Sequence, residues 1–236
     1  HAAHQEVPVA HRRRERLDLQ AAARGLLDAI GEHPEVVHEH AGGRPRGLEL
    51  ELDGRLGGGV PGLLQADHVP DAVVLPASAE EVAAVVAWCY ERDVPIVPRG
   101  GGTGFAAGAV PLEGGVVVGL ERLARIRSFD PLLWRIWIEA GATTGRLRRV
   151  VRESGLFFPP DPGAAEQSQI GGNIATNAGG PHAFKYGVTG AWVTGLEAVL
   201  APGELVSVGG PIRKDVAGYD LKSLLIGSEG TLGIVT

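Results

Sequence analysis

The chain has 236 residues, and 44% of them are hydrophobic, which is enough to bury a sizeable core in one or two domains. Its 22 basic and 28 acidic residues give a formal net charge of -6, which disfavours a general nucleic-acid-binding surface. The apolar stretches fall well short of the ~20 residues that span a bilayer, and the N-terminus lacks the pattern of an export signal. We therefore expect a soluble cytoplasmic chain with no membrane span and no nucleic-acid partner.

Residues 1–65 predict a helical and Gly-rich N-terminal segment. Apolar residues recur at helical spacing over 17–30, and a glycine-rich stretch with a short alternating piece at 48–52 follows. The sequence His-Glu-His at 38–40 brings two imidazoles together, but no third ligand converges with them, so no metal site is predicted. This segment carries no clear chemical signal.

A β-α-β unit is predicted next. Residues 72–76 have the composition of a strand, and Ser78 with Glu81 has the capping-box spacing that opens a helix to about residue 92. A second strand at 94–97 completes the unit. Because a helix separates the two strands, we expect them to pair in parallel, with the following segment at the carboxyl edge of the sheet, where ligands bind.

The chain contains a single cysteine, Cys89, which excludes an internal disulfide, a Cys-based zinc site and an iron–sulfur cluster built from this chain alone. Cys89 lies on one apolar face of the predicted helix, together with Val82, Val85 and Val86. We therefore expect Cys89 to be a small core residue without a chemical role.

A loop almost without side chains follows the second strand, where residues 98–104 read Pro-Arg-Gly-Gly-Gly-Thr-Gly. Glycine adopts positive φ without a Cβ clash, so successive N–H groups can turn toward one point and bind a diphosphate. A tight connection between two elements is the alternative. A Walker A loop is excluded because no Gly-Lys-Ser/Thr occurs, and a Rossmann site is disfavoured because the interval before the strand at 116–120 is too short for a crossover helix.

Two further glycine-rich blocks come later in the chain, at 169–180 and at 227–233. Paired glycines allow a ligand to approach closely, and the Asn and Thr side chains of the first block suit ribityl hydroxyls or the edge of a ring. Three separated segments of this kind indicate one extended ligand such as a dinucleotide, which needs a diphosphate site and long walls.

The second half of the chain has the alternation of short strands and turns that is typical of an antiparallel sheet. Short strands are predicted at 135–140, 193–201 and 205–208, with turns between them, and a helix is predicted at 144–154. The sequence therefore predicts an α+β fold with a small βαβ lobe and a larger, mainly antiparallel lobe that also contains helices.

Four motifs, in order along the chain, resemble those of the FAD-linked oxidase family, which has the vanillyl-alcohol-oxidase or PCMH-type FAD-binding fold. They are the loop at 98–104, the run Phe-Phe-Pro-Pro-Asp-Pro at 157–162, the block at 170–180 and the ending at 227–236. Several co-linear motifs are far more specific than one glycine-rich loop.

Two strings also resemble one branch of that family, which contains the glycolate oxidase FAD subunits and the D-lactate dehydrogenases. They read Asn-Ala-Gly-Gly-Pro-His-Ala-Phe-Lys-Tyr-Gly at 177–187 and Val-Ala-Gly-Tyr-Asp-Leu at 216–221. The resemblance covers about residues 66–236. It implies a PCMH-type FAD-binding domain with a small lobe at about 66–125, a larger lobe at about 126–236 and the flavin between them.

The resemblance implies that FAD is bound noncovalently, since the diphosphate loop has no histidine for a covalent link. The amides of 100–104 and the Thr103 hydroxyl would bind the diphosphate, the block at 170–180 would pass the isoalloxazine, and the ending would follow the ribose and adenine. Arg99 could instead form a salt bridge at the surface, and Glu229 could instead belong to a tight turn before a buried strand. His182 is expected to be a polar lining or surface residue. The residues expected to bind the cofactor are Arg99, Gly100, Gly101, Gly102, Thr103, Gly104, Pro160, Asp161, Gly171, Gly172, Asn173, Ala175, Thr176, Asn177, Gly180, Glu229 and Ile234.

The implied activity is FAD-dependent oxidation of a CH–OH group in a D-2-hydroxy acid, of the glycolate or D-lactate type, by hydride transfer to the flavin. In the family the substrate-binding part and the catalytic or metal-binding residues come later in the chain, so none is assigned, and a truncation before the substrate domain is expected. A separate electron-acceptor protein is a further expected partner. The alternatives are a noncatalytic or incomplete FAD-binding subunit, and an FAD-linked oxidase of a sugar or an aromatic alcohol.

Overall fold

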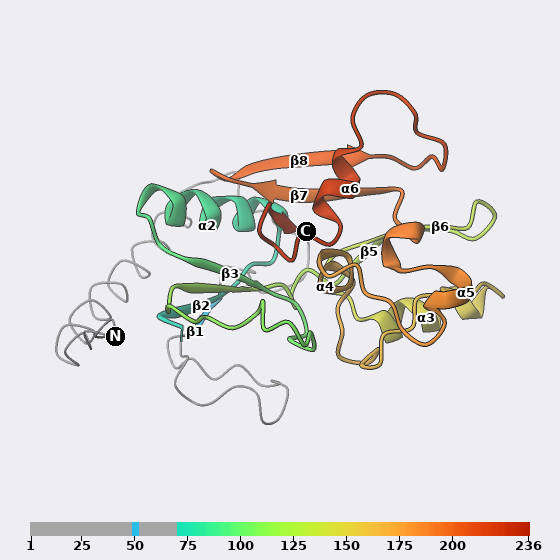
Figure 1. Cartoon of the computed structure of the whole chain (residues 1–236), viewed down its shortest axis with the longest axis horizontal. Coiled ribbons are helices and arrows are strands. Elements are labelled where there is room, and N and C mark those ends of the chain that lie inside the picture. The colour runs from blue at the N-terminus through green and yellow to red at the C-terminus, as the bar shows by residue number, and fades with distance from the viewer. Residues whose placement is uncertain (1–48, 52–69) are drawn as a thin grey trace, which may run out of the picture.

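The structure, a computed structural model, describes residues 49–51 and 70–236, which form two groups of strands, with a long helix between the first group and part of the second (Figure 1). The helix predicted at 17–30 and the His-Glu-His sequence at 38–40 lie outside the described residues. Part of the alternating piece at 48–52 forms strand β1 (Glu49–Glu51). In the described part of the chain, no helix is both long enough and apolar enough to cross a membrane.

The first group is a four-stranded sheet with the order β1-β2-β4-β3. Besides β1 it contains β2 (Ala72–Leu75), β3 (Ile96–Arg99) and β4 (Val116–Gly119). Strands β2, β4 and β3 are parallel, and β1 is antiparallel to β2. The predicted β-α-β unit is present, but the expected pairing of its two strands with one another is wrong, because β4 lies between them and pairs with both.

The composition of the strands explains this order. In β4, the three valines at 116–118 are all buried, which suits a central strand with both faces covered. Strand β3 contains Pro98, which has no N–H to donate to a second neighbour and therefore suits the edge of the sheet. A local pattern identifies a strand, but burial on both faces decides which strand takes the centre.

Helix α2 (Ala79–Glu91) connects β2 to β3 and lies between the two groups of strands (Figure 1). It begins as predicted: Ser78 Oγ accepts a hydrogen bond from the Glu81 N–H at 3.2 Å, and the Glu81 carboxylate accepts one from the Ala77 N–H at 2.7 Å. Burial raises the pKa of the Glu81 carboxyl group. The apolar face of α2 joins residues of both groups of strands in one continuous core.

The second group of strands is antiparallel, as predicted. Strands β5 (Ile126–Asp130) and β6 (Arg135–Ile138) form a hairpin. Strand β7 (Gly195–Leu200) pairs with β8 (Glu204–Gly209) and with β9 (Ile234–Val235), so the order is β8-β7-β9. The α+β fold class is therefore confirmed. A division into lobes near residue 125 stays a prediction, because the apolar core continues from one group to the other.

The helices of the second group come between these strands. They are α3 (Thr144–Glu153), α4 (Ile170–Ala175), α5 (Ala183–Tyr186), the 3-10 helix η1 (Thr189–Trp192) and α6 (Leu221–Leu225). Helix α3 matches the prediction for 144–154, and its start is capped by the Thr143 side chain, which accepts a hydrogen bond from the Arg146 N–H at 3.2 Å.

Helix α4 was not predicted from the sequence. Two of its residues are Gly171 and Gly172, and glycine disfavours a helix by about 1 kcal/mol per residue relative to alanine, so the local pattern favours a loop. Tertiary packing reverses that preference. A Cβ on Gly171 would lie 2.5 Å from the Cβ of Ala140, so this turn of helix fits against the chain that leaves β6 only without a side chain.

Cys89 is fully buried with the apolar face of α2, which confirms its predicted place in the core. Burial raises the pKa of the Cys89 thiol to about 12, so the thiolate is absent near neutral pH. We expect the native protein at about pH 8 to resist thiol-specific reagents, and the unfolded protein to react with one equivalent, because Cys89 is the sole cysteine. The absorbance of the released chromophore during titration with the reagent measures the number of reactive thiols. Rapid labelling of Cys89 in the native protein would contradict the prediction.

Candidate functional site

The structure brings the three glycine-rich segments together. An ideal Cβ on Gly100 would lie 3.6 Å from the Cα of Gly172, so the loop after β3 touches the start of α4. On the other side of α4, the Gly227 N–H donates to the Ile174 carbonyl oxygen at 3.0 Å. Segments far apart in the sequence thus meet at one place, which is the arrangement that a single extended ligand requires.

The loop at 100–104 is packed on one side and open on the other. A Cβ on Gly101 would lie 2.0 Å from the Gln167 carbonyl oxygen, so this residue is held tightly against the chain that precedes α4. Gly102 has φ of 65°, a conformation that favours glycine. At Gly104, by contrast, an added Cβ would meet no atom within 4 Å. The open side at Gly104 is where a ligand can approach the main chain.

The amides of this loop have no hydrogen-bond partner among the residues that the structure describes. Within residues 49–51 and 70–236, no carbonyl or side chain accepts a hydrogen bond from the N–H groups of residues 100–104. A run of free N–H groups at the carboxyl end of a parallel strand forms an anion site, and an ionic acceptor makes each hydrogen bond stronger than a neutral one. Binding of the two phosphates of a dinucleotide by this loop stays a prediction, and the unpaired amides are compatible with it.

Arg99 is the last residue of β3, immediately before the loop. Its side chain is partly buried, and this burial lowers the pKa of the guanidinium, while the carboxylate of Glu121 opposes the shift. The position is compatible with both roles considered for Arg99, beside a phosphate or in an ion pair. Its role in binding the cofactor stays a prediction.

The polar side chains of the second segment are engaged within the protein. The Asn173 side-chain amide donates to Thr144 Oγ1, which also bonds to Ser168 and so fastens α4 to the start of α3. The Thr176 hydroxyl donates to the Gly172 carbonyl oxygen at 2.9 Å. These side chains were expected to suit ribityl hydroxyls or the edge of a ring. In the structure they also hold the segment in place, and their contact with a cofactor stays a prediction. At Gly172 the main chain is open, with no atom within 4 Å of an added Cβ.

Asn177 has a similar structural use. It takes φ of 48°, a conformation that asparagine tolerates better than most residues, and its Oδ1 accepts a hydrogen bond from the Gly190 N–H at 2.9 Å. Contact of this segment with a cofactor stays a prediction, and Gly172 is the residue of the segment whose main chain is open.

Gln169 is a candidate that sequence reasoning missed. It is the residue before α4, and its side chain makes no capping hydrogen bond. Its Oε1 is buried, has no hydrogen-bond partner in the described part of the chain, and lies 3.5 Å from the position of a Cβ on Gly100. A buried unpaired acceptor is costly, so a donor from a ligand is the natural complement here. The signal in the sequence was a glutamine directly before the Ile-Gly-Gly of the block.

Asp161 connects the proline-rich run to two other segments. Its carboxylate forms an ion pair with Arg148 of α3 and lies 2.9 Å from His182 Nδ1. A Cβ on Gly180, which has φ of 132°, would lie 1.9 Å from the Asp161 carbonyl oxygen, so the end of the second glycine-rich block packs on this residue. Pro160, the preceding residue, is buried. The Asp161 side chain thus holds the site together.

The third segment reaches the site through its main chain. Glu229 has φ of 53°, and its N–H donates to the Ala175 carbonyl oxygen at 2.8 Å. Its side chain is exposed, and Oε2 lies 3.2 Å from the position of a Cβ on Gly108. The side chain of Ile234 belongs to the core, so only its backbone can touch a ligand. In the described part of the chain, no group of three or more His, Cys, Asp or Glu residues is placed to hold a metal ion.

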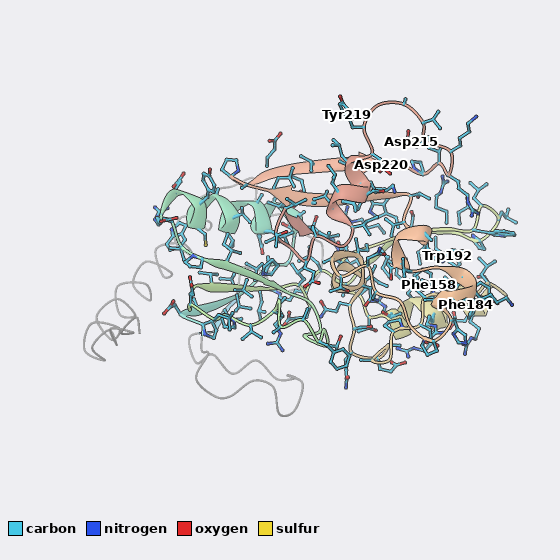
Figure 2. The ribbon with its side chains drawn as sticks, viewed as in Figure 1. Phe158, Phe184, Trp192, Asp215, Tyr219 and Asp220 are labelled. Carbon is cyan, nitrogen blue, oxygen red and sulfur yellow. The ribbon has the colours of Figure 1, made fainter. Side chains whose placement is uncertain are left out.

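A cavity of about 140 Å³ is lined by residues of α4, β6, β7 and η1, and its lining does not include the loop at 100–104. Its walls include Ile174, Phe158 and Trp192, and Figure 2 labels the two aromatic residues. This apolar cavity is separate from the phosphate-binding features of the site.

Comparison with known proteins assigns the chain to a family. The model of a family described as "FAD binding domain" matches residues 70–209, more than half of the chain. This chain belongs to that family of FAD-binding proteins, and FAD is its cofactor. The PCMH-type fold predicted from the sequence is thereby confirmed.

The relatives confirm the branch indicated by the sequence motifs. The chain is 46% identical over 172 residues to glycolate oxidase subunit GlcD of Bacillus subtilis (strain 168), which covers 73% of this chain and 37% of the relative. It is 43% identical over 167 residues to a D-lactate dehydrogenase of Anaerostipes hadrus, covering 71% of this chain and 35% of the relative. The chain therefore spans little more than a third of the length of these relatives.

Solved structures support the fold. Alkyldihydroxyacetonephosphate synthase superposes with a TM-score of 0.62 at 30% identity, covering 72% of this chain and 33% of that one. Phl p 4, a grass pollen allergen with glucose dehydrogenase activity, superposes with a TM-score of 0.62 at 26% identity, covering 73% of this chain and 35% of the allergen.

Gly101 and Gly104 offer a matched pair of tests of the loop. Gly101→Ala should lower the free energy of unfolding by about 2 kcal/mol or more, because the new methyl group meets the Gln167 carbonyl oxygen. Gly104→Ala should change stability by less than about 0.5 kcal/mol, because its methyl group meets no protein atom, but should weaken FAD binding by about tenfold. Urea unfolding and FAD titration measure the two effects. Equal stabilities of both variants would contradict the packing described here.

The Asp161 carboxylate offers a second test. Asp161→Asn should lower the free energy of unfolding by about 1 to 3 kcal/mol, because it leaves the partly buried Arg148 guanidinium, whose Nε is already unpaired, without its ionic partner. His182→Ala, which removes only the more exposed partner, should cost less than about 1 kcal/mol. Urea unfolding of both variants measures the difference, and a larger loss in His182→Ala would refute this ordering.

Proposed function

We propose that this chain is the FAD-binding part of a flavoenzyme that oxidises a D-2-hydroxy acid of the glycolate or D-lactate type. The observation that carries the cofactor role is the loop at 100–104, whose free amides meet two other glycine-rich segments at one site. The substrate class is supported by the names of the relatives, a glycolate oxidase subunit and a D-lactate dehydrogenase. A D-2-hydroxyglutarate dehydrogenase of Xanthomonas citri pv. viticola, 45% identical over 166 residues, is named for the same substrate chemistry.

Bound FAD would supply the hydride acceptor for the α-carbon of the hydroxy acid. The residues of this chain bind and orient it. The amides of 100–104 offset the charge of the diphosphate, and hydrogen bonds to a charged acceptor contribute about 1.5 to 3 kcal/mol each. Gln169 offers its unpaired Oε1 to a donor on the cofactor. The Arg148 and Asp161 ion pair holds the adjoining segment in position.

We propose noncovalent attachment of the flavin. The loop at 98–104 contains neither histidine nor cysteine, and the single cysteine of the chain is buried in the core. His182 is the histidine nearest to the glycine-rich block in sequence, and its Nδ1 is directed to Asp161. Precipitation with acid should therefore release all the flavin into solution.

The location and the electron route are further parts of the proposal. A net charge of -6 and one unpaired thiol fit the reducing cytoplasm. A separate electron-acceptor protein is supported by a relative that is named as a subunit. No residue of this chain is assigned as the catalytic base.

Reduction of the flavin tests the proposed substrate class. Under anaerobic conditions, glycolate or D-lactate should bleach the yellow absorption of the intact FAD-loaded protein, whereas L-lactate should not, because hydride transfer needs the α-hydrogen on the side that faces the ring. Glucose is the matched control, since one structural neighbour is a glucose dehydrogenase. Stopped-flow absorbance measures the rates.

The outcomes separate the alternatives. Bleaching by glucose but not by hydroxy acids would reject the proposed substrate in favour of a sugar oxidase. A yellow protein that is inert to every donor would identify a noncatalytic FAD-binding subunit.

A further inference from the structure

The turn of the β5–β6 hairpin exposes three large apolar side chains in succession. Leu132 is 92% exposed, Leu133 63% and Trp134 80%. Turns of this kind normally carry Gly, Asn, Asp or Ser, which satisfy the backbone at no hydrophobic cost. Figure 1 shows that the hairpin projects from the body at the end opposite α2. We name these three residues the hairpin tip.

The main-chain N–H groups of the hairpin tip all form hydrogen bonds within the turn. Asp130 Oδ1 accepts hydrogen bonds from the N–H groups of Leu132 at 3.0 Å and Leu133 at 3.1 Å. The Trp134 N–H donates to the Pro131 carbonyl oxygen at 3.4 Å. Internal satisfaction of backbone donors is what entry into an apolar medium requires, because no water is available there to replace a missing partner.

Trp134 also adopts an unusual backbone conformation. Its φ is 54°, and a bulky side chain at positive φ is a genuine outlier. Such strain persists only where the surrounding structure enforces it, and it concentrates at functional positions. The backbone conformation of Trp134 is therefore unfavourable, and its side chain is exposed. Packing within the described fold explains neither feature.

Basic residues lie beside the hairpin tip. Arg135 follows it directly, and its guanidinium donates to the Pro211 carbonyl oxygen at 3.1 Å. This bond joins the hairpin to the segment that carries Arg213 and Lys214, both exposed. Asp215 on that segment and Asp130 in the turn oppose these three cations, so the local excess of positive charge is small. The net charge of the whole chain is -6, which repels an anionic surface, so any attraction to such a surface would have to come from this local patch.

We propose that the hairpin tip docks the protein reversibly onto the surface of a lipid bilayer that contains anionic headgroups. Tryptophan and leucine would enter the interfacial region, where the indole ring is favoured, and the neighbouring cations would remain at the level of the headgroups. The shape favours lipid over protein. Three side chains on a convex turn fall far short of the roughly 800 Å² per partner of a stable protein interface, but they suffice for shallow attachment.

Vesicle binding tests the proposal with the intact protein. It should co-sediment with vesicles of phosphatidylcholine and phosphatidylglycerol, and more weakly with vesicles of phosphatidylcholine alone. The triple variant Leu132→Ser, Leu133→Ser, Trp134→Ser should bind at least about tenfold more weakly. The matched control is Tyr90→Ser, because Tyr90 is 63% exposed, as Leu133 is, but lies on α2 at the other end of the molecule (Figure 1). This control should bind like the wild type.

Tryptophan emission locates the contact. Vesicles should shift the emission of the wild type to shorter wavelength, and Trp134→Phe should abolish the shift while it keeps most of the binding, because phenylalanine remains apolar. Trp134→Phe also keeps the test decisive if the triple variant does not fold. The proposal is overturned if the wild type binds neither vesicle, if the folded triple variant binds as well as the wild type, or if Trp134→Phe keeps the shift. It is also overturned if loss of the tip only converts a lipid-free dimer to a monomer.

Discussion

Close main-chain contact between segments that lack side chains is the constraint on which the rest of this structure depends. A Cβ on Gly101 would lie 2.0 Å from the Gln167 carbonyl oxygen, and one on Gly141 would lie 1.8 Å from the Leu120 carbonyl oxygen. Both contacts join the parallel sheet to the segments of the second group. Because these contacts fix one side of the loop at 100–104, its amides are held in place, and no acceptor within residues 49–51 and 70–236 competes with an anion for them.

A buried carboxylate stiffens the same junction. The Glu139 side chain has no exposed surface; its carboxylate accepts a hydrogen bond from the Arg125 main-chain N–H at 2.6 Å and pairs with Arg125 and Arg127 at 2.8 and 3.4 Å. This hydrogen bonding raises the pKa of Arg125. These ion pairs fix the base of the β5–β6 hairpin just before Gly141, which packs against Leu120, the residue after β4. A site built on such a fixed frame needs little ordering when the cofactor binds.

Sequence patterns predicted the parts of the fold that local chemistry decides. The caps and apolar faces of α2 and α3 were readable because their spacing is a property of one segment, and the glycine-rich loop was readable because few other residues allow its conformation. The central position of β4 in the sheet could not be predicted, because the order of strands depends on which strand is buried on both faces. The hydrogen bonds of Asn173 and Asn177 within the protein could not be predicted either, because an amide bonds to whatever the fold brings near it. For the same reason the unpaired oxygen of Gln169 was visible only in three dimensions.

The β5–β6 hairpin links the two proposals physically. Its base is held by Glu139 beside the junction that supports the cofactor loop, and its turn presents Trp134 to the outside. Docking through the turn would therefore set the orientation of the flavin relative to the bilayer, because two paired strands connect the turn to the body of the protein. This arrangement matters for electron flow. The chain has one cysteine, buried in the core, so it holds no thiol pair to carry electrons onward. A fixed orientation at a surface would instead present the flavin to a separate acceptor at a constant distance and angle.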